Sequence, residues 1–188
     1  EDIAAEILRV QAQRELRKGY KYKLDTYKYE KFCNLFPYVE TNDQMNSIND
    51  VIDDMCSTKP MDRLICGDVG FGKTEVILRA AFLAVSNNKQ VIVIVPTTVL
   101  AKQHFETFSK RFNNYNYNID FISRVLSQKD KNEKVDYIKN GKIDIIIGTH
   151  SLLNKSIKYK DLGLLIIDEE HKFGVKHKET IKSLKENV

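Results

Sequence analysis

The sequence has few cysteines, and they form no pattern. Cys33, Cys56 and Cys66 are odd in number and far apart, with no C-x-x-C pair. A disulfide framework and a zinc site are both poor interpretations, so we expect reduced, packed thiols in a cytoplasmic protein. The four histidines, at positions 104, 150, 171 and 177, likewise form no pattern that indicates a metal centre.

Long hydrophobic runs and a signal peptide are also absent. Unbroken apolar runs such as Val91–Val95 are far shorter than the roughly 20 residues that a membrane-spanning helix needs. We therefore expect no membrane partner. Residue 1 is Glu rather than Met, so we expect the chain to be a piece of a longer protein.

The charge is nearly balanced. A net charge of +4 permits a nucleic-acid partner without demanding one, because a binding face needs local clustering rather than a large total. With 188 residues, 42% apolar and 30% charged, the chain suits one globular domain with a sizeable core.

The most informative stretch is Gly67-Asp68-Val69-Gly70-Phe71-Gly72-Lys73-Thr74, which fits G-x-x-x-x-G-K-[ST]. It follows a short apolar run, 64–66, and opens into residues with helical spacing, 75–84. A glycine-rich turn between a strand and a helix leaves backbone amides free to surround a phosphate. Lys73 is then expected to reach the outer phosphates, and the Thr74 hydroxyl to complete a Mg²⁺ shell. The alternative is an ordinary glycine-rich loop before a helix.

The rest of the chain alternates between strand and helix patterns. Residues 1–18 predict a lead-in helix that ends at Gly19, and 20–30 predict a connector with a short helix. Thr41 and Gln44 fit a capping box that begins a further helix. Helices are predicted over 98–112 and 128–140, and strands over 91–95, 119–122, 143–147 and 164–167. This order predicts an α/β domain with a mostly parallel sheet flanked by helices.

A second candidate site follows the last predicted strand, at Asp168-Glu169-Glu170-His171. Ligands of open parallel sheets bind beyond the carboxyl ends of the strands. Asp168 is placed to hold Mg²⁺ across from Thr74, and Glu169 to accept a proton from the attacking water. The alternative is that these acidic residues only begin a helix.

The two motifs together resemble motifs I and II of the superfamily 2 helicases and translocases. Residues 96–104 resemble motif Ia, Ser123-Arg124 resembles motif Ib, and 148–150 resembles motif Ic. Residues 61–75 and 161–179 resemble the bacterial transcription-repair coupling factor family more closely still. The resemblance implies a RecA-like P-loop NTPase fold, with a connecting helix and linker at 1–33 and the first ATP-binding lobe at 34–188.

The resemblance also implies individual roles. Gln44 is expected to read adenine, although the capping box alone also explains it, and Glu170 and His171 to couple the nucleotide site to the DNA site. Candidate contacts to DNA phosphates are Thr97, Thr98, Arg124, Thr149 and His150. The threonines could instead be cap residues, and Arg124 a solvated surface residue.

In the resembling family this lobe works with others. A second RecA-like lobe, absent here, supplies an arginine finger, which is worth roughly 10³–10⁵ in rate. We therefore expect ATP and Mg²⁺ as ligands, double-stranded DNA as a partner, and almost no hydrolysis from this lobe alone. RNA polymerase and UvrA are expected to bind domains outside this chain.

Three alternatives remain. The RecG fork-remodelling helicases usually have Ser, Gln and Glu where Phe71, Glu170 and Thr98 stand here. A nucleotide switch needs guanine-reading motifs that the sequence lacks, since residues 88–91 read N-K-Q-V. A non-catalytic structural module would require the phosphate loop to be vestigial.

Overall fold

The computed structural model describes residues 19–65, 72–154, 156–169 and 172. The chain divides into two compact units, Glu1–Leu83 and Ala84–Val188, and each is described by itself. The helix predicted over 1–18 lies outside the described residues. No helix in the described ranges is long and apolar enough to cross a bilayer.

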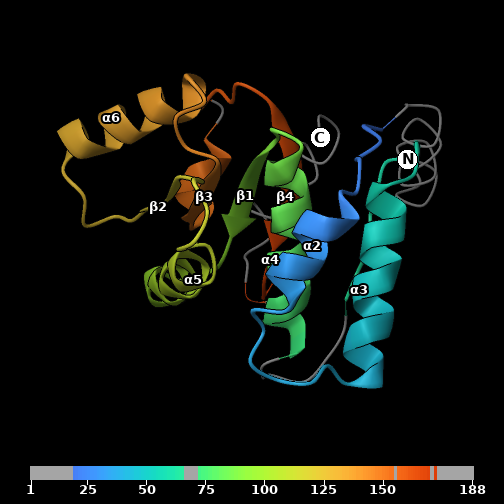
Figure 1. Cartoon of the computed structure of the whole chain (residues 1–188). Coiled ribbons are helices and arrows are strands. Elements are labelled where there is room, and N and C mark those ends of the chain that lie inside the picture. The colour runs from blue at the N-terminus through green and yellow to red at the C-terminus, as the bar shows by residue number, and fades with distance from the viewer. Residues whose placement is uncertain (1–18, 66–71, 155, 170–171, 173–188) are drawn as a thin grey trace, which may run out of the picture. The chain divides into compact units, whose positions relative to one another are not determined.

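The first unit contains α2 (Thr26–Cys33), α3 (Asn42–Met55) and most of α4 (Gly72–Ser86). Helix α2 begins where the Asp25 carboxylate accepts a hydrogen bond from the Lys28 amide at 3.1 Å, which satisfies a free N–H of the first turn. Its buried Phe32 stacks on Phe82 of α4, with ring centroids 4.3 Å apart. The stacked rings therefore hold α2 against α4. Figure 1 shows the ribbons of these two helices.

Helix α3 begins with the predicted capping box. The Thr41 hydroxyl accepts from the Gln44 amide at 3.2 Å, and Gln44 Oε1 accepts from the Thr41 amide at 2.8 Å. The side chains that α3 buries recur at helical spacing: Ile48, Val51, Ile52 and Met55.

The strand expected before the phosphate loop is not present at Leu64 and Ile65, and the rest of that run lies outside the described residues. Leu64 is 79% exposed. The preceding Arg63 is hydrogen-bonded to Asp54 at 2.7 Å and to Asp50 at 3.3 Å, both on α3. These contacts hold the segment beside α3, and Leu64 points to solvent.

The second unit is built on a parallel sheet with strand order β2-β3-β1-β4. The strands are β1 (Gln90–Ile94), β2 (Ile119–Ile122), β3 (Ile145–Gly148) and β4 (Leu162–Ile167). The central strand β1 pairs Val91 with Ile145 on one side and with Leu164 on the other. All three pairings are parallel, as the continuous apolar runs predicted.

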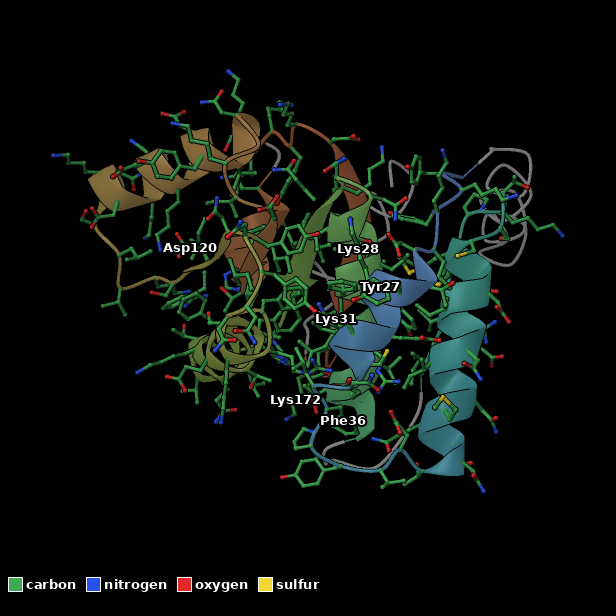
Figure 2. The ribbon with its side chains drawn as sticks, in the orientation of Figure 1. Tyr27, Lys28, Lys31, Phe36, Asp120 and Lys172 are labelled. Atoms are coloured by element: carbon green, nitrogen blue, oxygen red, sulfur yellow. The ribbon has the colours of Figure 1, made fainter. Side chains whose placement is uncertain are left out.

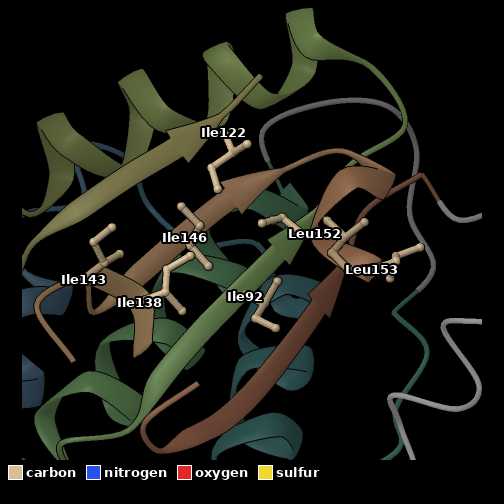
Figure 3. Packing of buried hydrophobic residues seen from close by; sticks show 8 residues of the cluster. Ile92, Ile122, Ile138, Ile143, Ile146, Leu152 and Leu153 are labelled. Carbon is tan, nitrogen blue, oxygen red and sulfur yellow. The ribbon is translucent and has the colours of Figure 1, made fainter. Parts of the chain in front are cut away.

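Alternate residues of the strands face opposite layers. Ile92, Ile94 and Ile146 pack with Ile138 of α6 (Gln128–Lys139) and with the short 3₁₀ helix η1 (His150–Leu153). Figure 3 labels Ile92, Ile146 and Ile138 in this cluster. Helix α5 (Thr98–Arg111) also packs against β2 and β3. Both predicted helices of this unit are confirmed to within a residue at their ends.

Strand β3 begins two residues later than predicted. The amides of Lys142 and Ile143 both donate to the Tyr137 carbonyl, which closes the end of α6 over Gly141 with φ of +72°. The Asp144 carboxylate accepts from the Asn118 amide at 2.8 Å. These bonds hold residues 142–144 in the connection from α6, and β3 begins after them at Ile145.

Candidate functional site

The phosphate-loop candidate enters the described structure at its last three residues. Gly67, Asp68, Val69, Gly70 and Phe71 lie outside the described residues, while Gly72, Lys73 and Thr74 form the first turn of α4. Lys73 and Thr74 are half-buried. The predicted helix after the loop is therefore present, and its first turn offers the free amides that favour an anion.

Gln44 lies directly beside this helix start. Both residues belong to the first unit, and Gln44 Cγ and Nε2 each lie 3.5 Å from the position that a Cβ atom would take on Gly72. Gln44 therefore has two roles in the geometry: Oε1 completes the cap of α3, and the rest of the carboxamide lies against the last glycine of the loop. The cap is confirmed, and adenine recognition stays a prediction.

A buried ionic cluster connects α4 to the segment before Gln44, and the sequence analysis missed it. Arg79 Nε donates to Glu75 Oε1 at 2.9 Å, one helical turn away, and Arg79 Nη2 donates to Glu40. The side chains of Arg79 and Glu75 are only 3% and 2% exposed. The Arg79 guanidinium also lies 5.8 Å from the centroid of Phe36, which is labelled in Figure 2.

The hydrogen bonds of the cluster favour the charged forms of Arg79 and Glu40. Burial alone would lower the pKa of Arg79, but the hydrogen bonds to Glu40 and Glu75 outweigh it, and the pKa is raised. The hydrogen bond from Arg79 in turn lowers the pKa of Glu40. The cluster therefore ties the Phe36–Gln44 segment to the phosphate-loop helix through paired charges.

In the second unit, Asp168 follows β4 at its carboxyl end. Its amide donates to the Ile94 carbonyl of β1 at 3.0 Å. Its Oδ1 accepts from the Glu169 amide at 3.0 Å, and its Oδ2 lies 2.9 Å from Nε2 of His104 on α5. The Asp168 side chain remains 22% exposed. The carboxylate is thus oriented by two hydrogen bonds and still reachable from solvent.

Glu169 has an unusual backbone conformation, with φ of +57°. A non-glycine residue in this region is costly and is held there by its surroundings. Its carboxylate pairs with Lys172 at 3.3 Å, and its carbonyl accepts from the Lys172 amide. The predicted coupling residues Glu170 and His171 lie outside the described residues.

The candidate DNA contacts lie at loop ends of the same unit. Thr97 is the N-cap of α5 and accepts from the Leu100 amide at 3.2 Å, and Thr98 is the first residue of that helix. Arg124 Nη2 lies 2.7 Å from His150 Nε2, so the structure brings two of the predicted residues together. Because guanidinium only donates, His150 Nε2 is the acceptor in this contact.

Thr149 differs from the other candidates. It is 2% exposed, it makes no side-chain cap for η1, and its Oγ1 has no hydrogen-bond partner among the described residues. Neither the cap alternative nor a hydroxyl contact to DNA matches this burial. A contact from this position would use the backbone.

Comparison with known proteins identifies the class. Residues 41–188 match the family model "DEAD/DEAH box helicase", and the chain belongs to this helicase family. A structure of RecG bound to a three-way DNA junction aligns with a TM-score of 0.80 at 34% identity, over 88% of this chain and 23% of that one. The UvsW helicase of bacteriophage T4 shares the fold, with a TM-score of 0.63 at 17% identity over 90% of this chain and 59% of that one.

The relatives with the higher sequence identities share one name. Over its whole length the chain is 55% identical to the transcription-repair-coupling factor of Escherichia coli K12 and 53% identical to that of Bacillus subtilis 168. The chain spans only 16% of the length of each. These findings confirm the predicted fold class and the family resemblance.

Proposed function

We propose that this chain is the first ATP-binding, RecA-like lobe of a motor that moves along double-stranded DNA. The observation that carries the proposal is the Asp168 carboxylate, oriented by two hydrogen bonds at the carboxyl end of β4 in a chain of the DEAD/DEAH box helicase family. Ligands of open parallel sheets bind at this edge.

The donor groups fit a magnesium nucleotide. Mg²⁺ prefers oxygen ligands, keeps several waters and takes one or two protein carboxylates together with substrate phosphates. Asp168 and the Thr74 hydroxyl supply oxygens of this kind. When bound with ATP, Mg²⁺ supplies neutralisation of the charge that develops on the transferred phosphoryl group.

Separate residues of the chain are proposed to bind the phosphates, to activate the water and to recognise the base. The amides of 67–72 and the Lys73 ammonium bind and orient the phosphates. Glu169 orients the attacking water and accepts its proton. Gln44 recognises the adenine edge, for which an amide that both donates and accepts is suited.

Double-stranded DNA is proposed to contact the other set of candidates: Thr97, Thr98, Arg124, Thr149 and His150. The exposed Arg124 beside His150 and the N-terminus of α5 are groups that bind phosphates without reading sequence. Affinity is then expected to fall steeply with salt.

The relatives' name supports a role in transcription-coupled DNA repair, and we propose that the protein acts in the cytoplasm. We propose that the whole motor displaces stalled RNA polymerase. Polymerase and UvrA are proposed to bind domains outside this chain, and the second RecA-like lobe is proposed to lie outside it as well. The chain covers only 16% of the length of these relatives. Because that second lobe carries the arginine finger in the resembling family, residues 1–188 alone are expected to show no DNA-stimulated ATPase.

Nucleotide binding by the chain tests the proposal. In a fluorescence competition assay with Mg²⁺, ATP is expected to displace labelled ATP far better than GTP. Lys73→Ala is expected to weaken binding more than about tenfold, roughly 1.4 kcal/mol, whereas Lys139→Ala, an exposed lysine of α6, serves as the matched control. Equal competition by GTP would favour the nucleotide-switch alternative. An unchanged affinity of Lys73→Ala for nucleotide would favour the structural-module alternative.

A RecG-like fork-remodelling motor is the second candidate, favoured by the structural alignment at 34% identity. The 55% identity to a transcription-repair-coupling factor supports the first candidate over it. Joining the chain to the second lobe and the polymerase-binding domain of such a relative allows a direct comparison. Displacement of a stalled polymerase without fork reversal is the expected result, and fork reversal without displacement would support the alternative.

A further inference from the structure

We propose that His104 is a positioning residue, which holds the Asp168 carboxylate in the orientation that binds a magnesium nucleotide. The inference rests on the function proposed above. It assigns a role to a side chain on α5 that belongs to neither the phosphate loop nor the acidic motif.

The contact joins two distant parts of the second unit. His104 Nε2 lies 2.9 Å from Asp168 Oδ2, across 64 positions of sequence. Asp168 is also held by its own backbone, since its amide donates to Ile94 of the central strand. Oδ1 accepts from the Glu169 amide. The backbone position is therefore fixed by the sheet, and His104 together with the Glu169 amide fixes the rotation of the carboxylate.

The chemistry of the pair sets the direction of the hydrogen bond. An ionised carboxylate only accepts, so the imidazole proton is on Nε2. A carboxylate has about four lone-pair sites, and the bonds from His104 and Glu169 occupy one on each oxygen. The Asp168 side chain is also 22% exposed, so a metal or its bound water can approach the carboxylate from solvent.

The surroundings of His104 keep its ring in place. His104 is buried on the same stripe of α5 as Ala101 and Phe108, and its ring lies edge-on to Phe108 with centroids 6.3 Å apart. A polar group is costly to bury unless it is hydrogen-bonded. Because the ring is packed and its bonded nitrogen faces Asp168, the histidine acts as a fixed support and not as a mobile surface group.

Partners of this kind tune metal sites. Carboxylates that ligate metals are themselves hydrogen-bonded, and loss of such a partner costs about 10–100-fold in metal affinity or activity. The expected consequence is a specific loss of metal affinity, with no loss of affinity for nucleotide in the absence of metal.

The test measures Mn²⁺ binding by electron paramagnetic resonance in the presence of a non-hydrolysable ATP analogue, together with analogue affinity in EDTA. His104→Ala is expected to weaken Mn²⁺ affinity about 10–100-fold and to leave the affinity in EDTA unchanged. His104→Gln places an amide N–H near the position of Nε2 and is expected to recover most of the loss. His104→Asn places it near Nδ1 and is expected not to.

Phe108→Leu is the matched control, because it reduces packing beside His104 without removing the bond to Asp168. It is expected to keep Mn²⁺ affinity. Equal losses with metal and in EDTA, or no loss in His104→Ala, would overturn the inference while leaving the proposed function in place. If His104→Ala does not fold, equal Mn²⁺ affinities of the Gln and Asn variants would overturn it. Failure of the unmodified chain to bind the analogue with Mn²⁺ would overturn both proposals.

Discussion

Removal of the Arg79 charge should destabilise the chain strongly. Arg79→Met keeps much of the side-chain volume and the helix propensity of α4, but it removes the guanidinium that hydrogen-bonds to Glu75 and Glu40. The effect is therefore expected to come from electrostatics and not from a cavity.

The magnitude follows from burial. The Glu75 side chain is 2% exposed, and loss of one partner of a buried ion pair costs roughly 3–5 kcal/mol. Glu40 is 23% exposed and can turn to water, so its share is small. Since domains are stable by only about 5–15 kcal/mol, this single change removes a large part of the total.

Urea denaturation followed by circular dichroism measures the loss as a fall in the transition midpoint. The double variant Arg79→Met with Glu75→Met is expected to recover most of it, because replacement of a whole buried pair by apolar groups is often neutral. Lys139→Ala on the exposed side of α6 should change stability by less than about 0.5 kcal/mol. A cost below about 1 kcal/mol for Arg79→Met, or no recovery in the double variant, would refute the reasoning about paired burial.

Three further outcomes are expected. The hydrogen bond from Arg79 lowers the pKa of Glu40 from its ordinary 4.5. The stability that this contact contributes is therefore present above pH 4.5 and is lost as the pH falls through the lowered pKa. The unfolding free energies of the unmodified chain and of Glu40→Gln should converge in acid. Gln44→Glu keeps the acceptor that bonds to the Thr41 amide, so a thermal melt should change little while ATP affinity falls; equal affinity would remove the adenine role. Arg124→Ala should reduce the slope of log affinity against log salt for duplex DNA by about 1, measured by fluorescence anisotropy with the second lobe restored, and an unchanged slope would exclude a phosphate contact.

Regular structure in this chain follows from local pattern. The β-branched run of β1 predicted a strand buried on both faces, and all five of its residues are buried. Thr41 and Gln44 predicted a reciprocal cap, and both of its hydrogen bonds are present. These predictions succeed because the physical cause lies within a few residues of sequence.

Predictions that depend on distant groups fared differently. The apolar run at Leu64–Ile65 matched a strand locally, but Arg63 is bound to Asp50 and Asp54 of α3, and the backbone follows that contact. Thr149 is a residue type that often caps helices and it precedes η1, yet its side chain is buried and makes no cap hydrogen bond. In both cases tertiary packing decides, and no short window of sequence contains it.

The two contacts that were not predicted from the sequence have one feature in common: each involves a polar residue at a position of a helix that is expected to be buried. His104 falls on the apolar stripe of α5, three residues after Ala101 and four before Phe108, and Arg79 lies within the apolar core of α4. A polar side chain at such a position must find a partner, since an unpaired buried polar group costs about 1–3 kcal/mol. The helix pattern therefore predicts that a partner exists, but only the parallel sheet, by placing the end of β4 beside α5, determines that the partner of His104 is Asp168.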